Sequence, residues 1–126
     1  MAGQQLSSDL LVGILRDTIT SLVRRDGVDL SARQLGVFLI CYLNDGAHTV
    51  RGLAQELNIS KPAITRALDR LSELDFVRRK VDPYDRRSIL VQRTVKGAAF
   101  LRELRHIMVD ATSTQKTEAT GRRAAA

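Results

Sequence analysis

Residues 60–74, SKPAITRALDRLSEL, and residues 75–94, DFVRRKVDPYDRRSILVQRT, together decide the fold. The first stretch spaces its apolar residues three and four apart, which predicts an amphipathic helix. Ser60 can cap this helix, and Pro62 is tolerated in its first turn because amides there have no partner within the helix. The predicted apolar stripe consists of Ile64, Ala67, Leu68 and Leu71.

The second stretch predicts a basic β-hairpin. Alternation places Val77, Arg79 and Val81 on one face over about 76–82, and Ile89 and Val91 on one face over about 88–93, as in two short strands. Pro83 fixes one backbone angle between the strands, and the neighbouring aspartates favour turn geometry. A wing over about residues 76–93 is therefore expected.

A shorter helix precedes these elements over roughly residues 50–57, with Thr49 as its cap. Only the residues NIS, 58–60, join it to the next helix, so the two helices must cross steeply, and the small Ala54 permits their close approach. This arrangement is a helix-turn-helix, whose second helix presents its N-terminal half to the major groove of DNA. With the hairpin behind it, the pattern is a winged helix-turn-helix.

Amphipathic helices are predicted on both sides of this motif. One covers about residues 8–25, another begins at the capping box formed by Ser31 and Gln34, and a last one starts at Thr94. Its periodicity fades after Asp110, which predicts a polar and disordered tail. The expected organisation is an N-terminal dimerisation helix over 1–30, a winged helix-turn-helix domain over 31–96, a C-terminal helix over 97–110 and a tail over 111–126. The fold class is mainly α with a small β-hairpin.

Composition narrows the class of protein further. The 126 residues suffice for about one domain, no apolar run approaches the roughly 18 residues of a membrane span, and the start MAGQQLSSD does not resemble a signal peptide. With a single cysteine, Cys41, these features predict a cytoplasmic protein. Residues 49–96 carry 11 Lys and Arg against 6 Asp and Glu, hence +5 of the net charge of +6. Such a surface favours a polyanion, although a merely solvated face remains the alternative.

Residues 53–97 also resemble the DNA-binding core of the MarR family of bacterial transcription regulators. The similarity extends over about residues 30–108 when the helix LSARQLGVFLICYL is included. It is carried by the spacing of Leu53, Ala54, Ile59, Ser60, Thr65, Arg66, Leu68, Leu71, Val77, Arg79, Asp85, Arg87, Leu90, Val91 and the run from Thr94 to Gly97.

This resemblance implies a protein that probes the major groove with the recognition helix and the minor groove with the wing. A homodimer that binds a pseudo-palindromic operator is expected, because the apolar stripes Leu10 to Val23 and Phe100 to Met108 exceed what one winged domain needs. The resemblance also implies a repressor that responds to a small aromatic effector. The recognition-helix candidates for DNA contact are Ser60, Lys61, Pro62, Ala63, Thr65, Arg66 and Arg70. The wing candidates are Arg86, Arg87, Arg79 and Lys80, with Asp85 as a structural brace that pairs with Arg87 and fixes its direction. For Arg79, flanked by valines, a structural ion pair is the competing interpretation.

Three departures from the family pattern stand out. Asp75 occupies the position of a common helix-closing glycine and must adopt a left-handed conformation or end the helix differently. Arg93 replaces the leucine usual before Thr94. The polar sequence after Asp110 raises the question of how a dimer forms without a long final helix.

Other functions find less support in the sequence. No nucleotide-binding, zinc-protease or hydrolase motif is present, so no enzyme and no cofactor are expected. His48 and His106 stand isolated, which predicts no metal site, and Cys41 lies in an apolar run typical of a core rather than of a redox sensor. The main competitor is a winged helix that binds an acidic protein partner. The groove-facing Lys61, Thr65 and Arg66 favour DNA instead.

Overall fold

The computed structural model describes residues 7–125, and side chains as far as Gly121. The chain divides into two compact units. The central unit comprises residues 30–101, and the terminal unit comprises residues 1–29 and 102–126. Residues 1–6 of the predicted N-terminal segment, and residue 126 of the predicted tail, lie outside the described residues.

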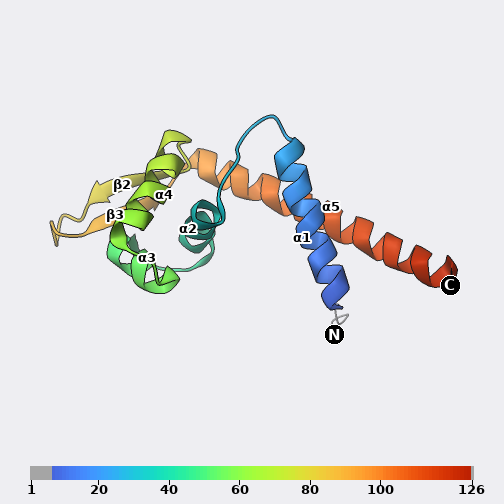
Figure 1. Ribbon diagram of the computed structural model, residues 1–126. Helices are drawn as coiled ribbons and strands as arrows, with labels where there is room; N and C mark the ends of the chain where they lie inside the picture. Colours follow the sequence, from blue (N-terminus) through green and yellow to red (C-terminus); the bar gives the residue numbers. More distant parts are fainter. Residues whose placement is uncertain (1–6, 126) are drawn as a thin grey trace. The chain divides into compact units, whose positions relative to one another are not determined.

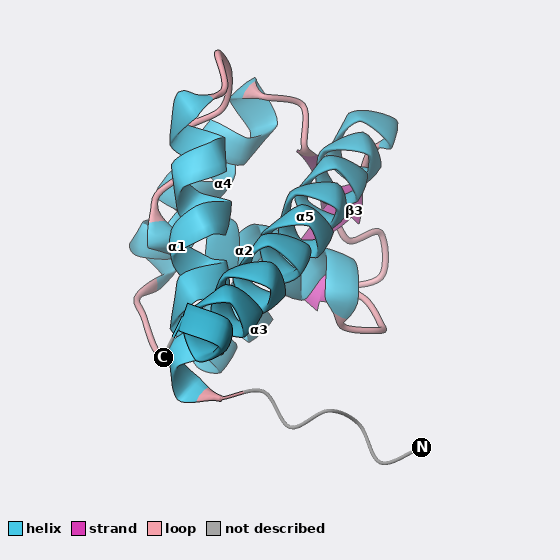
Figure 2. Ribbon diagram, turned by 90° about the vertical axis from the view of Figure 1, so that its right-hand side faces the viewer, coloured by secondary structure: helices cyan, strands magenta, loops and turns pink. Residues whose placement is uncertain are grey.

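The central unit has the predicted winged helix-turn-helix order, and the mainly α fold with a small sheet is confirmed (Figures 1 and 2). Its sheet is antiparallel in the order β1-β3-β2, with Arg79 opposite Val91 in the hairpin. The two-residue strand β1 was not predicted because it is too short to show an alternation. The elements are α2 (Ala32–Leu43), β1 (His48–Thr49), α3 (Val50–Leu57), α4 (Lys61–Glu73), β2 (Val77–Val81), β3 (Ile89–Arg93) and the start of α5 (Val95–Ala125).

The predicted helix boundaries are confirmed by their caps. The Ser31 hydroxyl accepts the Gln34 amide while the Gln34 side chain accepts the Ser31 amide, which completes the capping box. Thr49 and Ser60 cap α3 and α4 in the same way. Asp75 adopts the left-handed conformation with φ 58°, so the chain leaves α4 without the glycine that this geometry usually favours.

Four aromatic rings form the centre of the core in the central unit. Phe38 stacks on Tyr42 at 4.5 Å between ring centroids and meets Phe100 edge-on at 5.3 Å. Phe76, at the base of the wing, stacks on Phe100 at 4.6 Å. These contacts join α2, the end of the α4–β2 connection and the start of α5 around one apolar cluster.

The Tyr42 hydroxyl organises the polar side of this cluster. It donates to the Phe76 carbonyl at 2.7 Å and accepts the Thr94 amide at 2.9 Å. The Thr94 hydroxyl donates to the Asp75 carbonyl at 2.6 Å and accepts the Gly97 amide at 2.9 Å, which caps α5. Two hydrogen bonds therefore hold the entry and the exit of the wing against α2, and a third joins the entry to the exit.

Arg93 extends this attachment to the end of α2. Its guanidinium donates to the Cys41 carbonyl at 2.8 Å and to the Asn44 carbonyl at 3.3 Å, and lies 5.7 Å from the centre of the Tyr42 ring. The last carbonyls of a helix lack partners within it and attract cations. Arg93, which stands where the family usually has leucine, thus caps the C-terminal end of α2.

The terminal unit contains α1 (Ser8–Arg24) and the rest of α5. The prediction that residues 111–126 form a disordered tail after a helix over 97–110 is wrong, because α5 continues to Ala125. Its buried stripe includes Leu104, Ile107, Ala111 and Gln115. A small residue and a polar one carry the later part of the stripe, so a search for apolar periodicity misses it.

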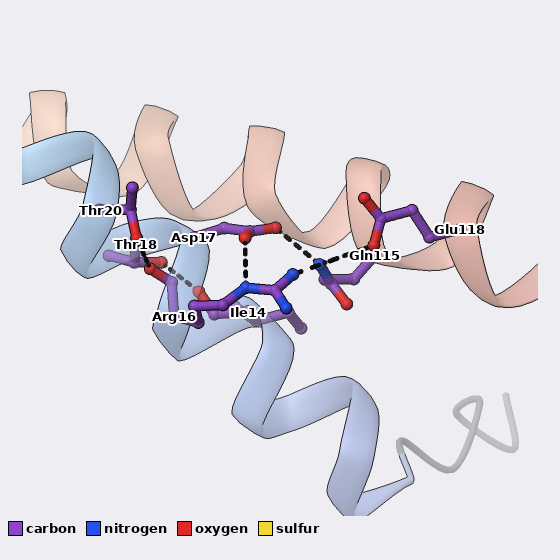
Figure 3. Close-up of polar contacts among 7 residues, drawn as sticks. All are labelled: Ile14, Arg16, Asp17, Thr18, Thr20, Gln115 and Glu118. Atoms are coloured by element: carbon purple, nitrogen blue, oxygen red, sulfur yellow. Dashed lines mark hydrogen bonds and ion pairs between the residues drawn. The ribbon is translucent and has the colours of Figure 1, made fainter. Parts of the chain in front are cut away.

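Gln115 is buried because polar partners surround it (Figure 3). Its amide nitrogen donates to Asp17 at 2.7 Å and to Glu118 at 3.3 Å, and Arg16 donates to the other Asp17 oxygen at 3.0 Å. The hydrogen bonds from Gln115 and from Arg16 lower the pKa of Asp17. Gly13 makes room, since a Cβ there would lie 2.2 Å from the Gln115 side-chain oxygen.

We predict that Gly97→Ala destabilises the central unit by about 3 kcal/mol, from overpacking and a disturbed buried hydrogen bond. An added Cβ would lie 1.8 Å from the Tyr42 hydroxyl oxygen and 2.4 Å from the Phe76 carbonyl oxygen, and the latter belongs to the backbone. The matched control is Gly36→Ala in α2, where the nearest atom is 3.9 Å away and alanine favours the helix. Urea unfolding of both variants measures the difference, and equal stabilities would contradict the prediction.

Candidate nucleic-acid interface

Helix α4 separates its residues cleanly into two faces. Ile64, Leu68 and Leu71 are fully buried, because they face α2 and α3 in the core of the central unit. The residues between them are exposed, namely Lys61, Pro62, Thr65, Arg66 and Asp69, with Arg70 half-buried. The helix therefore presents a polar face that starts at its N-terminus, as a recognition helix does.

Two residues of α4 and its cap that were predicted to contact DNA serve the fold instead. Ala63 is 6% exposed, so its assignment to the DNA-facing surface is wrong: it lies beside Ile64 on the packed side of the first turn. The Ser60 hydroxyl accepts the Ala63 amide at 3.2 Å, so it is engaged as the cap, although the residue itself is exposed.

Three carboxylates bind cations near the base of the wing. Arg79 contacts Asp69 of α4 at 2.8 Å, which supports the structural ion pair considered as the alternative for this residue. Arg78 contacts Asp75 at 3.4 Å, and Arg70 contacts Glu73 at 3.5 Å within α4. Each pair reduces the positive potential close to the C-terminal end of α4.

Other cations in this surface have no such partner. Within the described residues, no ion pair involves Lys61 or Arg66 in the first turns of α4, or Lys80, Arg86 or Arg87 of the wing. All five residues are exposed. The free positive charge is therefore concentrated in two places, the N-terminal half of α4 and the outer part of the hairpin.

Asp85 braces the wing in a different manner from the one predicted. Its carboxylate accepts the Arg87 backbone amide at 3.1 Å and the Ser88 hydroxyl at 3.2 Å. In the described part of the chain it forms no ion pair with the Arg87 guanidinium, so the predicted side-chain pairing is wrong. A short aspartate side chain caps its own turn more easily than it reaches a long arginine two residues on. Arg87 thus keeps its full charge.

Redox sensing and metal binding find little support in the described residues. Burial raises the pKa of the Cys41 thiol from 9.0 to about 11, against the opposing effect of Arg93, so the thiolate needed for redox sensing is scarce. The described residues contain no group of three or more potential metal ligands. No helix in the described part of the chain is long and apolar enough to cross a membrane.

Comparison with known proteins agrees with this geometry. A family model described as the MarR family matches residues 28–88. An uncharacterized HTH-type transcriptional regulator of Mycobacterium bovis is 31% identical over 101 residues, which cover 80% of this chain and 70% of that protein. The chain belongs to the MarR family. It is therefore a DNA-binding transcription regulator, and the expectation that it is not an enzyme is confirmed by that membership.

Solved structures of transcription regulators are similar in fold. Wild-type MarR from E. coli, in its apo form, is 25% identical with a TM-score of 0.65, over 87% of this chain and 79% of that one. The transcriptional repressor CouR, bound to a 23-mer DNA duplex, is 24% identical with a TM-score of 0.68, over 91% of this chain and 78% of that one.

Sequence reasoning missed several residues that shape this MarR-type surface. Asp69 holds Arg79 and so joins α4 to the wing. The Tyr42 hydroxyl holds both ends of the hairpin. Neither role leaves a local signal, because the partners lie far away along the chain.

The Cys41 thiol generates a prediction on pH. Because its folded-state pKa is about 11 and its ordinary value is 9.0, the unfolded chain loses this proton first as the pH rises. The contribution of Cys41 to stability is thus full below about pH 9 and falls until about pH 11. Unfolding free energies of the parent and of Cys41→Ala should converge over this range. A constant difference would contradict the prediction, and slow reaction of the folded protein with a thiol reagent provides a second measurement.

Proposed function

We propose that this MarR-family protein is a ligand-responsive repressor that binds a pseudo-palindromic operator as a homodimer, with α4 in the major groove and the wing in the minor groove. The observation that carries the proposal is the placement of free cations at two sites, the first turns of α4 and the outer wing. A small aromatic effector belongs to the proposal through the sequence resemblance. As a regulator of this kind it acts on DNA in the cytoplasm.

The polar face of α4 suits base readout in the major groove. Arg66 is exposed and unpaired in the described structure, and an arginine can bond guanine bidentately. The neighbouring Thr65 can contact a thymine methyl, and Lys61 can bind a phosphate. Arg70 is partly engaged by Glu73, so we assign it a lesser role at the phosphate backbone.

The wing suits the minor groove. Arg86 and Arg87 lie at the turn of the hairpin, exposed and without an acidic partner in the described structure. Narrow minor grooves attract inserted arginines through their negative potential. Arg79 serves a different purpose, since its ion pair with Asp69 fixes the wing against α4, and Lys80 remains a phosphate contact.

Dimer formation is supported by an exposed apolar face of α1. Gly13, Ile14 and Thr18 are buried within the terminal unit, whereas a second face of the same helix remains in water. Contiguous exposed apolar surface on a helix indicates an interaction site. The exposed residues of this stripe are Leu11, Val12, Leu15, Ile19 and Val23, between 43% and 71% exposed. Two-fold pairing would place two recognition helices about 34 Å apart.

Two arginine variants test the division of roles between α4 and the wing. Arg66→Ala should cost about 1–3 kcal/mol on the preferred operator and relax the preference among sequences. Arg87→Ala should weaken binding to all duplexes and lower the slope of log affinity against log salt by about one. Fluorescence anisotropy with a duplex from upstream of its own gene and with a random duplex measures both. Identical losses on all sequences for the two variants would contradict the assignment.

Charged substitutions in the α1 stripe test the dimer. Leu15→Glu combined with Ile19→Glu should convert the protein to a monomer, because burying two carboxylates in an apolar interface is strongly unfavourable. Light scattering should give twice the chain mass of 14.0 kDa for the parent and 14.0 kDa for the variant. Val95→Glu, an 88% exposed position outside this stripe, is the control and should stay dimeric. A parent protein that scatters as a monomer at micromolar concentration would refute the dimer.

A further inference from the structure

Tyr84 lies at the turn of the wing with its side chain almost wholly in water. It is 97% exposed, while the other four aromatic residues of the chain are between 0% and 8% exposed. The ring of a tyrosine is usually buried, and only its hydroxyl reaches solvent. The solvated ring of Tyr84 thus has no part in the stability of the fold.

The backbone around Tyr84 is nevertheless held firmly. The Tyr84 amide donates to the Asp82 carboxylate at 2.9 Å, and the Asp82 amide donates to the Ser88 carbonyl at 2.9 Å. On the far side of the turn, the Ser88 amide donates to the Asp85 carbonyl at 2.9 Å, and the Asp85 carboxylate accepts the Arg87 amide. Two aspartates thus fix the loop on either side of a ring that makes no packing contact of its own.

The surroundings of Tyr84 combine apolar and cationic groups. Val81 and Ile89, the last cross-strand pair of the hairpin, are 54% and 39% exposed. Arg86 and Arg87 follow in the same turn and are free of acidic partners in the described residues. Figure 1 shows this hairpin end projecting away from the helices of the central unit. A surface of this composition matches a minor groove, whose walls offer apolar deoxyribose faces between phosphates.

We propose that Tyr84 is a further DNA-contacting residue, packing its ring against deoxyribose at the edge of the minor groove and donating its hydroxyl to a phosphate oxygen. This inference rests on the proposed function of the wing. Because the contact is made to sugar and phosphate, it adds affinity on every sequence. Because tyrosine is neutral, it adds that affinity without releasing a counterion.

Variants at this position separate the Tyr84 contact from the arginine contacts. Tyr84→Ala should weaken binding about three- to tenfold on operator and random duplexes alike, with an unchanged salt slope. Tyr84→Phe should recover part of that loss, and full recovery would overturn the phosphate hydrogen bond. If Arg87→Ala lowers affinity and salt slope while Tyr84→Ala changes nothing, the Tyr84 proposal fails and the wing proposal stands. If neither variant changes binding, the wing itself is wrongly assigned.

Tyrosine nitration gives a direct readout on the unaltered protein. The chain has two tyrosines, and Tyr42 is 8% exposed, so it serves as the internal control. Tetranitromethane should nitrate Tyr84 rapidly and Tyr42 slowly in the free protein. Bound duplex should slow nitration of Tyr84 alone, and enough salt to dissociate the complex should restore the rate. Undiminished nitration of Tyr84 in the saturated complex would overturn the proposal.

Discussion

The hydrogen bonds of the Tyr42 hydroxyl are the constraint on which the winged motif depends. A two-stranded hairpin alone is at best marginally stable in water, and this one exposes most of its side chains. Tyr42 engages Phe76 where the hairpin begins and Thr94 where it ends, so both ends of the hairpin are fastened to α2 in the core of the central unit. Gly97 is required there because no side chain fits beside the hydroxyl.

Acidic residues then divide the cations of the same unit between structure and binding. Asp69 and Asp75 engage Arg79 and Arg78 near the base of the wing, where the pairs fix geometry more than they add stability. Asp85 and Asp82 instead accept backbone amides and shape the turn. The carboxylates near the hairpin end thus order the loop without neutralising the arginines beside them, which explains why aspartates stand among arginines in this basic hairpin.

Much of this arrangement could be predicted from the sequence, and the failures share a cause. Caps and amphipathic stripes are local patterns, so the helices from Ser31, Thr49 and Ser60 were placed correctly. The end of α5 was misjudged because its buried face uses Ala111 and Gln115, which an apolar pattern does not count. The direction of the Asp85 carboxylate depended on competition between a near backbone amide and a farther guanidinium. Both features depend on three-dimensional contacts, which the spacing of residues along the sequence does not reveal.

Gln115 also sets how α1 pairs with α5 inside the terminal unit. A buried amide between two helices is costly in every register except the one that satisfies it, so its hydrogen bond to Asp17 specifies that register while Gly13 provides the space. With this face of α1 committed to α5, Leu11, Leu15 and Ile19 are turned toward water. A polar contact within the terminal unit therefore determines which apolar stripe of α1 stays exposed. In the proposed dimer this is the stripe that a second copy would bury, so the register of α1 against α5 would govern assembly as well as folding.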